Sequence, residues 1–321
     1  MNYIVLDLEW NQAADSEDER CKMLTFEIIE IGAVKLNNRM ETVDSFHELI
    51  RPQVYKEMHK ITERLIHIHM EQLALCRTFP EVAGDFMAWC AGPGKEPFMF
   101  GTWGPMDLTE LQRNMRFFGM EPLGEGPLCF YDVQKLFSIA YEDGKSRRSL
   151  EYAVDFLGLK KAKRFHRALG DADYTAEVLQ KIKDPAALRR VSYDTFQLPR
   201  DHKSEVHVVF DNYAKYISRP FFSKEELLAD REVISTRCYL CHRNLRRRIR
   251  WFSPNGKHYY SLSYCDKHGF MKGKIRIRKA EDDRVFAVKT TKIITEEEAK
   301  QLQGRREHTR QMRRERRGHH S

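Results

Sequence analysis

The first half of the chain alternates short apolar runs with amphipathic stretches. Three early runs rich in β-favouring residues are joined by short polar links, which predicts adjacent antiparallel strands. Later, Thr78-x-x-Glu81 with Pro80 forms a capping box that predicts a helix start. The predicted strands are 3–6, 27–36, 42–50, 98–100 and 129–131, and the predicted helices are 79–89, 108–118, 132–141, 149–157 and 171–182. This order favours an α/β sheet with helices packed on its faces.

The second half has a different pattern. Residues 184–230 are predicted to be helical connectors, with a capping box at 223–226. Farther on, aromatic and apolar runs flank polar turns, which predicts hairpins at 250–262 and 274–288. We therefore expect a front domain (1–185), a helical connector (186–235), a small β-rich module (236–295) and a basic helical or disordered tail (296–321).

Charge is divided unevenly between these parts. The chain has 321 residues and a formal net charge of +8. From Arg237 onward it holds 24 Lys and Arg against 9 Asp and Glu, whereas the preceding residues hold 31 basic and 38 acidic side chains. A strongly basic module favours a polyanionic partner, most often nucleic acid. No apolar run approaches the roughly 18 residues of a membrane span, and the N-terminal run lacks the basic start of a signal peptide. We expect a cytoplasmic protein with no membrane partner.

Acidic residues stand at the ends of the predicted front elements. Asp7 and Glu9 are two positions apart at the end of the first strand, so their side chains face the same side. A cation between them would remove their mutual repulsion, although two solvated loop acids are the simpler alternative. Asp107 follows a buried strand and a Gly/Pro loop, and His166 precedes Asp171 by five residues at a predicted helix start. Taken singly, Asp107 and Asp171 are ordinary acids of a first helical turn.

Together, Asp7-x-Glu9, Asp107 and His166-x4-Asp171 resemble the three exonuclease motifs of the DEDDh superfamily, in order. The segments 28–34 and 149–159 resemble that family's second strand and the stretch before its third motif, so the resemblance covers roughly residues 1–185. The sequences Asp-Leu-Glu-Trp and Thr-Trp-Gly-x-Met-Asp are most similar to those of the histone-mRNA and small-RNA 3′-end exonucleases, including the sporulation-inhibitor type. The resemblance implies an RNase H-like fold, with a mixed sheet flanked by helices, and hydrolysis from the 3′ end of nucleic acid.

The resemblance also implies roles for individual residues. His166 would be the general base, and two Mg²⁺ or Mn²⁺ ions would be bound by Asp7, Glu9, Asp107 and Asp171. Such hard cations prefer carboxylate oxygens, and a pair of them suits phosphodiester hydrolysis. Candidates for contacts to nucleic acid near these motifs are Trp10, Asn11, Arg164 and Arg167. The alternative for Trp10 is packing in the core.

Three of the seven cysteines cluster in the predicted β-rich module (236–295). Cys238-x2-Cys241 and Cys265-x2-His268 are separated by 23 residues that include an aromatic-rich hairpin. Two such pairs predict one structural Zn²⁺ site in a zinc-ribbon-like module. His242 and His258 are alternative fourth ligands.

Arginines surround these proposed zinc ligands. Further candidates for nucleic-acid contacts are Arg246, Arg247, Arg248, Arg250 and Trp251, because cations follow phosphates and aromatic rings stack on bases. A solvated basic face is the alternative. We expect a 3′–5′ exonuclease that favours RNA over DNA, whose basic C-terminus contacts structured RNA or the ribosome. The alternatives are a single-stranded DNA exonuclease and a non-catalytic RNA- or ribosome-binding protein on a nuclease fold.

Overall fold

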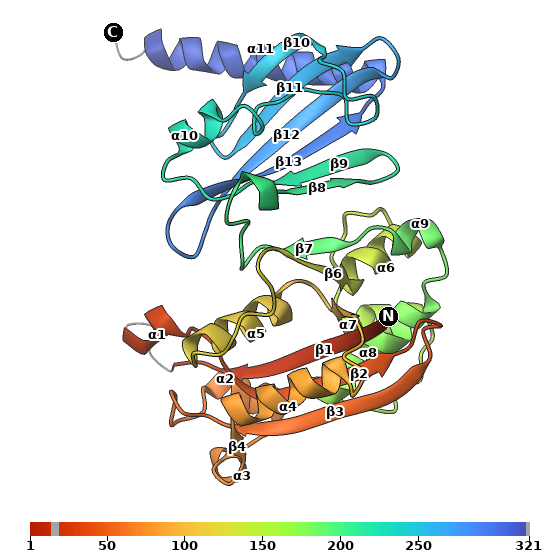
Figure 1. The fold of residues 1–321 in the computed structure, drawn as a ribbon, viewed down its shortest axis with the longest axis vertical. Helices are drawn as coiled ribbons and strands as arrows, with labels where there is room; N and C mark the ends of the chain where they lie inside the picture. The colour runs from red at the N-terminus through yellow and green to blue at the C-terminus, as the bar shows by residue number, and fades with distance from the viewer. Residues whose placement is uncertain (14–18, 319–321) are drawn as a thin grey trace. The chain divides into compact units, whose positions relative to one another are not determined.

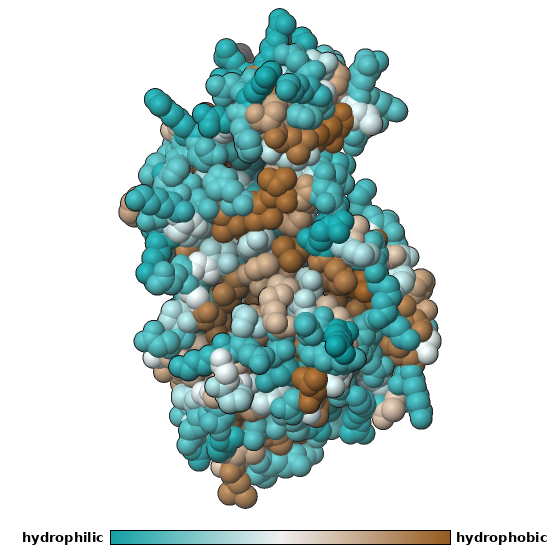
Figure 2. All heavy atoms as spheres, turned by 45° about the vertical axis from the view of Figure 1, so that its right-hand side comes forward, coloured by the Kyte–Doolittle hydropathy of each residue, from teal (hydrophilic) through white to brown (hydrophobic). Residues whose placement is uncertain are grey.

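The computed structural model describes residues 1–13 and 19–318, which form two compact units (Figure 1). Unit 1 comprises residues 1–124 and 128–196, and unit 2 comprises residues 125–127 and the chain from 197 onward. The visible surface is mostly hydrophilic, with apolar residues confined to patches (Figure 2). Across the described residues, no helix has both the length and the apolar character needed to cross a membrane.

Unit 1 is built on a seven-stranded mixed sheet. The strands are β1 (Asn2–Asn11), β2 (Glu27–Leu36), β3 (Thr42–Arg51), β4 (Arg77–Thr78), β5 (Phe98–Thr102), β6 (Leu128–Asp132) and β7 (Ser192–Asp194), in the order β4-β3-β2-β1-β5-β6-β7. The predicted meander is present, since β1, β2 and β3 pair antiparallel. β5 runs parallel to β1, and β6 runs parallel to β5. Every residue of β2 is buried, so this strand is covered on both faces.

Two hydrophobic clusters cover the two faces of this sheet. Ile4 and Leu6 pack with α4 (Phe79–Ala91) and α5 (Met106–Phe117) on one face. Val5 packs on the other face with α6 (Val133–Tyr141), α7 (Leu150–Phe156) and α8 (Ala168–Lys181). This division follows from the alternation of side chains along a strand. The helices are α1 (Glu19–Met23), α2 (Lys60–Ile66), α3 (Met70–Leu73), α4 (Phe79–Ala91), α5 (Met106–Phe117), α6 (Val133–Tyr141), α7 (Leu150–Phe156), α8 (Ala168–Lys181) and α9 (Pro185–Leu188). The predicted α/β architecture is confirmed.

Unit 2 is a six-stranded antiparallel sheet with two helices. Its strands are β8 (Val206–Val209), β9 (Tyr213–Ile217), β10 (Arg246–Phe252), β11 (His258–Cys265), β12 (Gly269–Lys279) and β13 (Val285–Ile293), in the order β10-β11-β12-β13-β9-β8. A short 3-10 helix, η1 (His202–Ser204), precedes them. The helices are α10 (Lys224–Ala229) and α11 (Glu296–Gly318). Leu227 of α10 packs in one hydrophobic cluster of this unit, and Ala299 and Leu302 of α11 pack in another with Ile249 and Leu262.

The interval 186–235 differs from the predicted helical connector. It contains most of α9, the helix α10 and the 3-10 helix η1, but also β7, β8 and β9. The last two strands form a hairpin that pairs with β13 through β9. The physical reason is strand pairing: the short runs Val206–Val209 and Tyr213–Ile217, rich in β-favouring residues, pair with each other across Asp211-Asn212, and the second also pairs with β13. The β-rich module is therefore larger than the predicted pair of hairpins, and the basic tail is helical as far as residue 318.

Candidate active site

Four acidic side chains meet beside the second half of β1. Asp7 and Glu9 are half-buried on the same side of this strand, and Asp171 lies in the first turn of α8. Oxygen atoms of these three carboxylates lie within 4.8 Å of one another. Asp107, in the first turn of α5, is buried and its Oδ1 accepts the backbone N–H of Leu8 at 3.3 Å. The structure thus brings the four predicted acids together from β1, α5 and α8.

A close approach between α8 and β2 positions Asp171. Asp7 is paired with Gly32 across the β1–β2 ladder. A Cβ atom at Gly32 would lie 2.1 Å from backbone atoms of Ala168 and Leu169, at the start of α8. Glycine is therefore required at this position, because any side chain would push the helix away. The helix begins directly against the strand, and its first turn brings Asp171 to Asp7.

Burial and mutual repulsion raise the pKa of these carboxyl groups. Burial, followed by repulsion from Asp107 and Glu9, places the pKa of Asp7 well above its usual range. Burial, followed by repulsion from Glu30 and Asp171, raises the pKa of Glu9 to about 8. Burial is the main cause that raises the pKa of Asp107 to about 7 and that of Asp171 to about 6. A carboxylate cluster with raised pKa values is one that a cation would relieve.

The donor set fits hard divalent cations. Every candidate ligand at this site is a carboxylate oxygen, the type that Mg²⁺ and Mn²⁺ prefer. Oδ1 of Asp171 is buried and has no hydrogen-bond partner. A buried acceptor without a partner is costly, so this oxygen provides an independent reason to expect a bound cation.

His166 lies beside the cluster on a constrained loop. Its side chain is exposed and its backbone is left-handed, with φ of 59°. Its backbone N–H donates to Oδ2 of Asp171 at 3.1 Å. The next residue, Arg167, donates through Nε and Nη2 to the carboxylate of Glu30 at 3.0–3.2 Å. The loop is therefore fixed to α8 on one side of His166 and to β2 on the other.

Glu30 was not predicted to belong to the site. It is fully buried on β2, is paired with Glu9, and also lies 2.6 Å from Nε2 of His47. Burial raises its pKa, but the hydrogen bonds from His47 and Arg167 outweigh this and lower the pKa below its usual value. The sequence signal for this role is an acid in the middle of an otherwise apolar strand.

The candidates for nucleic-acid contact near the motifs have different environments. Trp10 packs on Phe26, with ring centroids 5.3 Å apart, and lies against the core. Asn11 is fully buried; its Nδ2 donates to the carbonyl of Glu57 at 2.8 Å and its Oδ1 accepts the N–H of His59 at 2.9 Å. Arg164 is exposed, whereas Arg167 is engaged with Glu30. Arg164 is thus the one of these four whose side chain is exposed.

The sequence profile of the RNase T exonuclease family matches residues 4–179, which is more than half of the chain. The chain belongs to this exonuclease family. It is 31% identical over 184 residues to the DNA polymerase III subunit epsilon of Haemophilus influenzae, a match that covers 54% of this chain and 64% of that protein. The chain thus spans less than two thirds of the length of this relative.

The fold is similar to that of a solved nuclease domain. The nuclease domain of 3′hExo, a DEDDh family member bound to rAMP, has a TM-score of 0.51 and 19% identity, covering 60% of this chain and 96% of that one. Exonuclease I of E. coli, in complex with a dA16 oligonucleotide, has a TM-score of 0.46 and 11% identity, covering 75% of this chain and 59% of that one. The predicted exonuclease family and the RNase H-like fold are confirmed.

Outside the exonuclease domain, unit 2 holds a cluster of three cysteines and a histidine. Ligand atoms of Cys238, Cys241, Cys265 and His268 all lie within 4.8 Å of one another. The Sγ atoms of Cys241 and Cys265 are 3.7 Å apart, and Nδ1 of His268 lies 3.3 Å from Sγ of Cys238. A tetrahedral zinc site with Zn–S bonds of about 2.3 Å places its sulfurs about 3.8 Å apart. The donors therefore fit Zn²⁺, and this cluster contains His268 and neither His242 nor His258.

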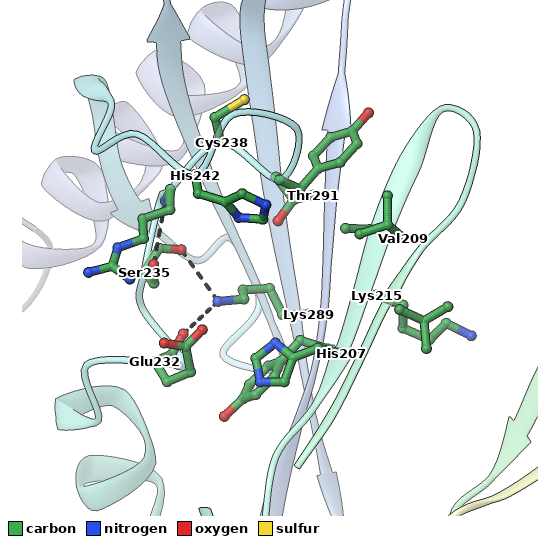
Figure 3. A pocket seen from close by; sticks show the side chains of 14 residues that line it. His207, Val209, Lys215, Glu232, Ser235, Cys238, His242, Lys289 and Thr291 are labelled. Atoms are coloured by element: carbon green, nitrogen blue, oxygen red, sulfur yellow. Dashed lines mark hydrogen bonds between the residues drawn. The ribbon is translucent and has the colours of Figure 1, made fainter. Parts of the chain in front are cut away.

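A buried lysine supports the loop that leads to this cluster. Nζ of Lys289 donates to the backbone carbonyls of Glu232 and Ser235, and Figure 3 shows it among residues that line a small pocket, including Cys238 and His242. Burial lowers the pKa of Lys289 to about 8. The contacts of Lys289 hold residues 232–235 against β13, just before the first cysteine pair.

The remaining candidates for nucleic-acid contact lie on β10. Trp251 is half-buried, and its Nε1 donates to the carbonyl of Ile234 at 2.8 Å. This contact places its ring in the core of unit 2. The four arginines Arg246, Arg247, Arg248 and Arg250 are all exposed.

Proposed function

We propose that this protein is a metal-dependent exonuclease that removes nucleotides from the 3′ end of RNA. The observation that carries the proposal is the convergence of four carboxylates from three elements beside the His166 loop. Two Mg²⁺ or Mn²⁺ ions would be held by Asp7, Glu9, Asp107 and Asp171. When bound, such ions stabilise the negative charge that develops during phosphodiester hydrolysis.

In this proposal His166 accepts the proton of the attacking water. An imidazole can act as a base near neutral pH, and the exposed side chain of His166 is accessible to substrate. Its position is fixed by the N–H bond to Asp171, so that the base and the cluster keep their spacing during the reaction. Positioning of this kind supplies much of the rate enhancement in hydrolysis.

RNA is the first candidate substrate because the first and middle motifs resemble those of RNA 3′-end exonucleases. DNA is the second candidate, because the polymerase subunit is 31% identical to this chain. A cytoplasmic location, with reduced cysteines, belongs to the same proposal, as does contact between the basic C-terminus and structured RNA or the ribosome.

Degradation of 5′-labelled RNA and of DNA with the same sequence tests these functions. The proposal expects stepwise shortening of the RNA from its 3′ end with Mg²⁺ or Mn²⁺ and none without a divalent ion. The turnover of His166→Ala should be about 10²–10⁴-fold lower, and this variant should still bind RNA. Faster shortening of DNA would support the second candidate. Binding of RNA without shortening would support a non-catalytic protein instead.

We also propose that Cys238, Cys241, Cys265 and His268 bind one structural Zn²⁺ ion. The support is the spacing of the donors and the environment of the thiols. Although burial raises the pKa of Cys265, backbone N–H groups of Lys267 and His268 lower it below its usual value. Metal analysis of purified protein should find about one zinc per chain, and a value near zero would contradict the site.

A further inference from the structure

Five arginine side chains line one groove of unit 2, which encloses about 550 Å³. They come from two elements that are far apart in the sequence, β10 and α11. The five are Arg247, Arg248, Arg250, Arg306 and Arg310. In the described part of this unit, the ion pairs involve other basic residues, among them Lys279, Arg284 and Lys300. The groove therefore gathers positive charge, and among the described residues none of its five arginines forms an ion pair, although Glu307 lies between Arg306 and Arg310 on α11.

The irregular pairing of β10 contributes to this arrangement. The strand lies at the edge of the sheet, and its register against β11 shifts between Arg247 and Ile249. Such a bulge inserts an extra residue and re-aims the side chains around it. Ile249 is buried, while Arg247, Arg248 and Arg250 all stay exposed.

Helix α11 completes the groove. Its first turns face the sheet with Ala299 and Leu302, which are buried against β10 and β11. One turn farther along, the groove is lined by Arg306 and Arg310, which are separated by about 6 Å along the helix axis. The next turn is anchored by Arg313, whose Nη2 donates to the carbonyl of Ser253 at 2.7 Å.

Protection of a sheet edge does not explain this groove. Charged side chains on an edge strand discourage pairing with other chains, and β10 alone would supply them. The arginines of α11 add positive charge beside the arginines of β10. The repulsion between these side chains costs free energy unless an anion is bound. A helix that only covered the edge would gain more from acidic residues at these positions.

We infer that this groove binds the sugar–phosphate backbone of a nucleic acid strand. Guanidinium groups form paired hydrogen bonds to phosphate oxygens, and several in one groove match successive phosphates. The guanidinium of Arg248 also lies 5.6 Å from the ring centroid of Tyr264, which helps to orient it. The site consists of residues of unit 2 alone. It binds phosphate charge and does not distinguish base sequence.

Salt-dependent binding tests the inference. Full-length protein carrying Asp7→Asn, so that the probe is not shortened, is titrated with a fluorescein-labelled single-stranded 20-nucleotide RNA. In this background, Arg306→Gln with Arg310→Gln should reduce the slope of log K against log salt by about 1.4, because each phosphate contact contributes about 0.7. If binding at 1 M salt is unchanged, this corresponds to about 60-fold weaker binding at 50 mM.

Two further variants control for net charge and for folding. Lys279→Gln with Lys300→Gln removes the same two charges from exposed sites of unit 2 and should leave the slope within about 0.3 of the parent. Arg306→Lys with Arg310→Lys keeps the charge and should keep the slope. The glutamine variant should melt no lower than its parent, since it relieves repulsion. An unchanged slope in the glutamine variant, or an equal loss in the Lys279/Lys300 control, would overturn the inference. The assay measures binding alone, so its outcome is independent of the hydrolysis proposed above.

Discussion

Replacement of Arg167 should disconnect the His166 loop from the central sheet. The guanidinium of Arg167 makes three hydrogen bonds of 3.0–3.2 Å to Glu30, whose carboxylate is fully buried. In Arg167→Gln, that carboxylate would keep its hydrogen bond with His47 and lose its permanently charged partner. The chain at residue 166 would also lose its attachment to β2.

The expected cost in stability follows from the burial of the two partners. Removal of one partner from a buried ion pair costs about 3–5 kcal/mol. The side chain of Arg167 is 33% exposed, so solvent screens the pair and the lower end applies. The hydrogen bond between Glu30 and His47 also remains in place. We therefore expect Arg167→Gln to lower the free energy of unfolding of unit 1 by about 2–3 kcal/mol.

The expected effect on activity follows from the position of His166. A shift of about 1 Å in a catalytic group can reduce the rate by about a hundredfold. Because Arg167 holds the loop and is not free to contact substrate, kcat should fall by roughly 10–100-fold while KM changes little. Urea unfolding and steady-state hydrolysis of a labelled RNA measure the two effects.

The exposed Arg164 supplies a matched control. Arg164→Gln removes the same charge three residues away and should change the free energy of unfolding by less than about 0.5 kcal/mol. In a double-mutant cycle with Glu30→Gln, the Arg167 substitution should cost about 2 kcal/mol less than it does alone. A variant at Arg167 with normal stability and a raised KM would refute this reasoning, and would mean that the guanidinium contacts substrate.

Three further predictions concern the fold, the zinc cluster and the carboxylates. Gly32→Ala should lower the free energy of unfolding by about 1–3 kcal/mol through overpacking against α8 and should also lower kcat. Gly84→Ala, where a Cβ meets nothing within 4 Å, should leave the free energy of unfolding and kcat unchanged. Normal turnover in Gly32→Ala would contradict the close approach. Cys241→Ser should abolish zinc binding and unfold unit 2 before unit 1 in a thermal melt followed by circular dichroism; a single unchanged transition would contradict the site. Since the pKa values of Glu9 and Asp107 are raised to about 8 and about 7, the folded protein without divalent ions holds protons that the unfolded chain releases. Its free energy of unfolding should therefore fall from pH 5 to pH 8 while its apparent affinity for Mn²⁺ rises, and the opposite pH trend in urea unfolding would contradict the cluster.

The acids of the candidate site could be predicted because Asp7-x-Glu9, Asp107 and His166-x4-Asp171 together resemble the motifs of a known exonuclease superfamily. Local spacing supports only part of this set. Asp7 and Glu9 share a side through the period of a strand, and Asp171 stands at a helix start that the sequence already indicates. Glu30 and Arg167 could not be predicted in the same way. They are 137 positions apart, and their contact depends on strand register and on the seating of α8. From sequence alone, Arg167 is one of several basic residues in a run.

The fold of unit 1 could be predicted more fully than that of unit 2. In unit 1, long apolar strands and clear helix starts mark the elements. In unit 2, β8 and β9 have four and five residues, and they are stabilised by pairing with β13, some 70 positions later in the chain. Short strands of this kind depend on tertiary partners more than on local propensity, which is why a single capping box nearby suggested a helical connector.

The separation of charge between the units has a kinetic consequence. The carboxylate cluster repels a polyanion until cations occupy it, so affinity for long substrates has to come from positive charge elsewhere. The five-arginine groove supplies such charge without any part in bond cleavage. Substitutions in the groove should therefore raise KM for long RNA and leave the turnover of a dinucleotide unchanged, because a dinucleotide offers too few phosphates to occupy both sites. Substitutions in the cluster should reduce turnover of long and short substrates alike. If groove variants slowed dinucleotide hydrolysis, binding and cleavage would not be separable in this protein.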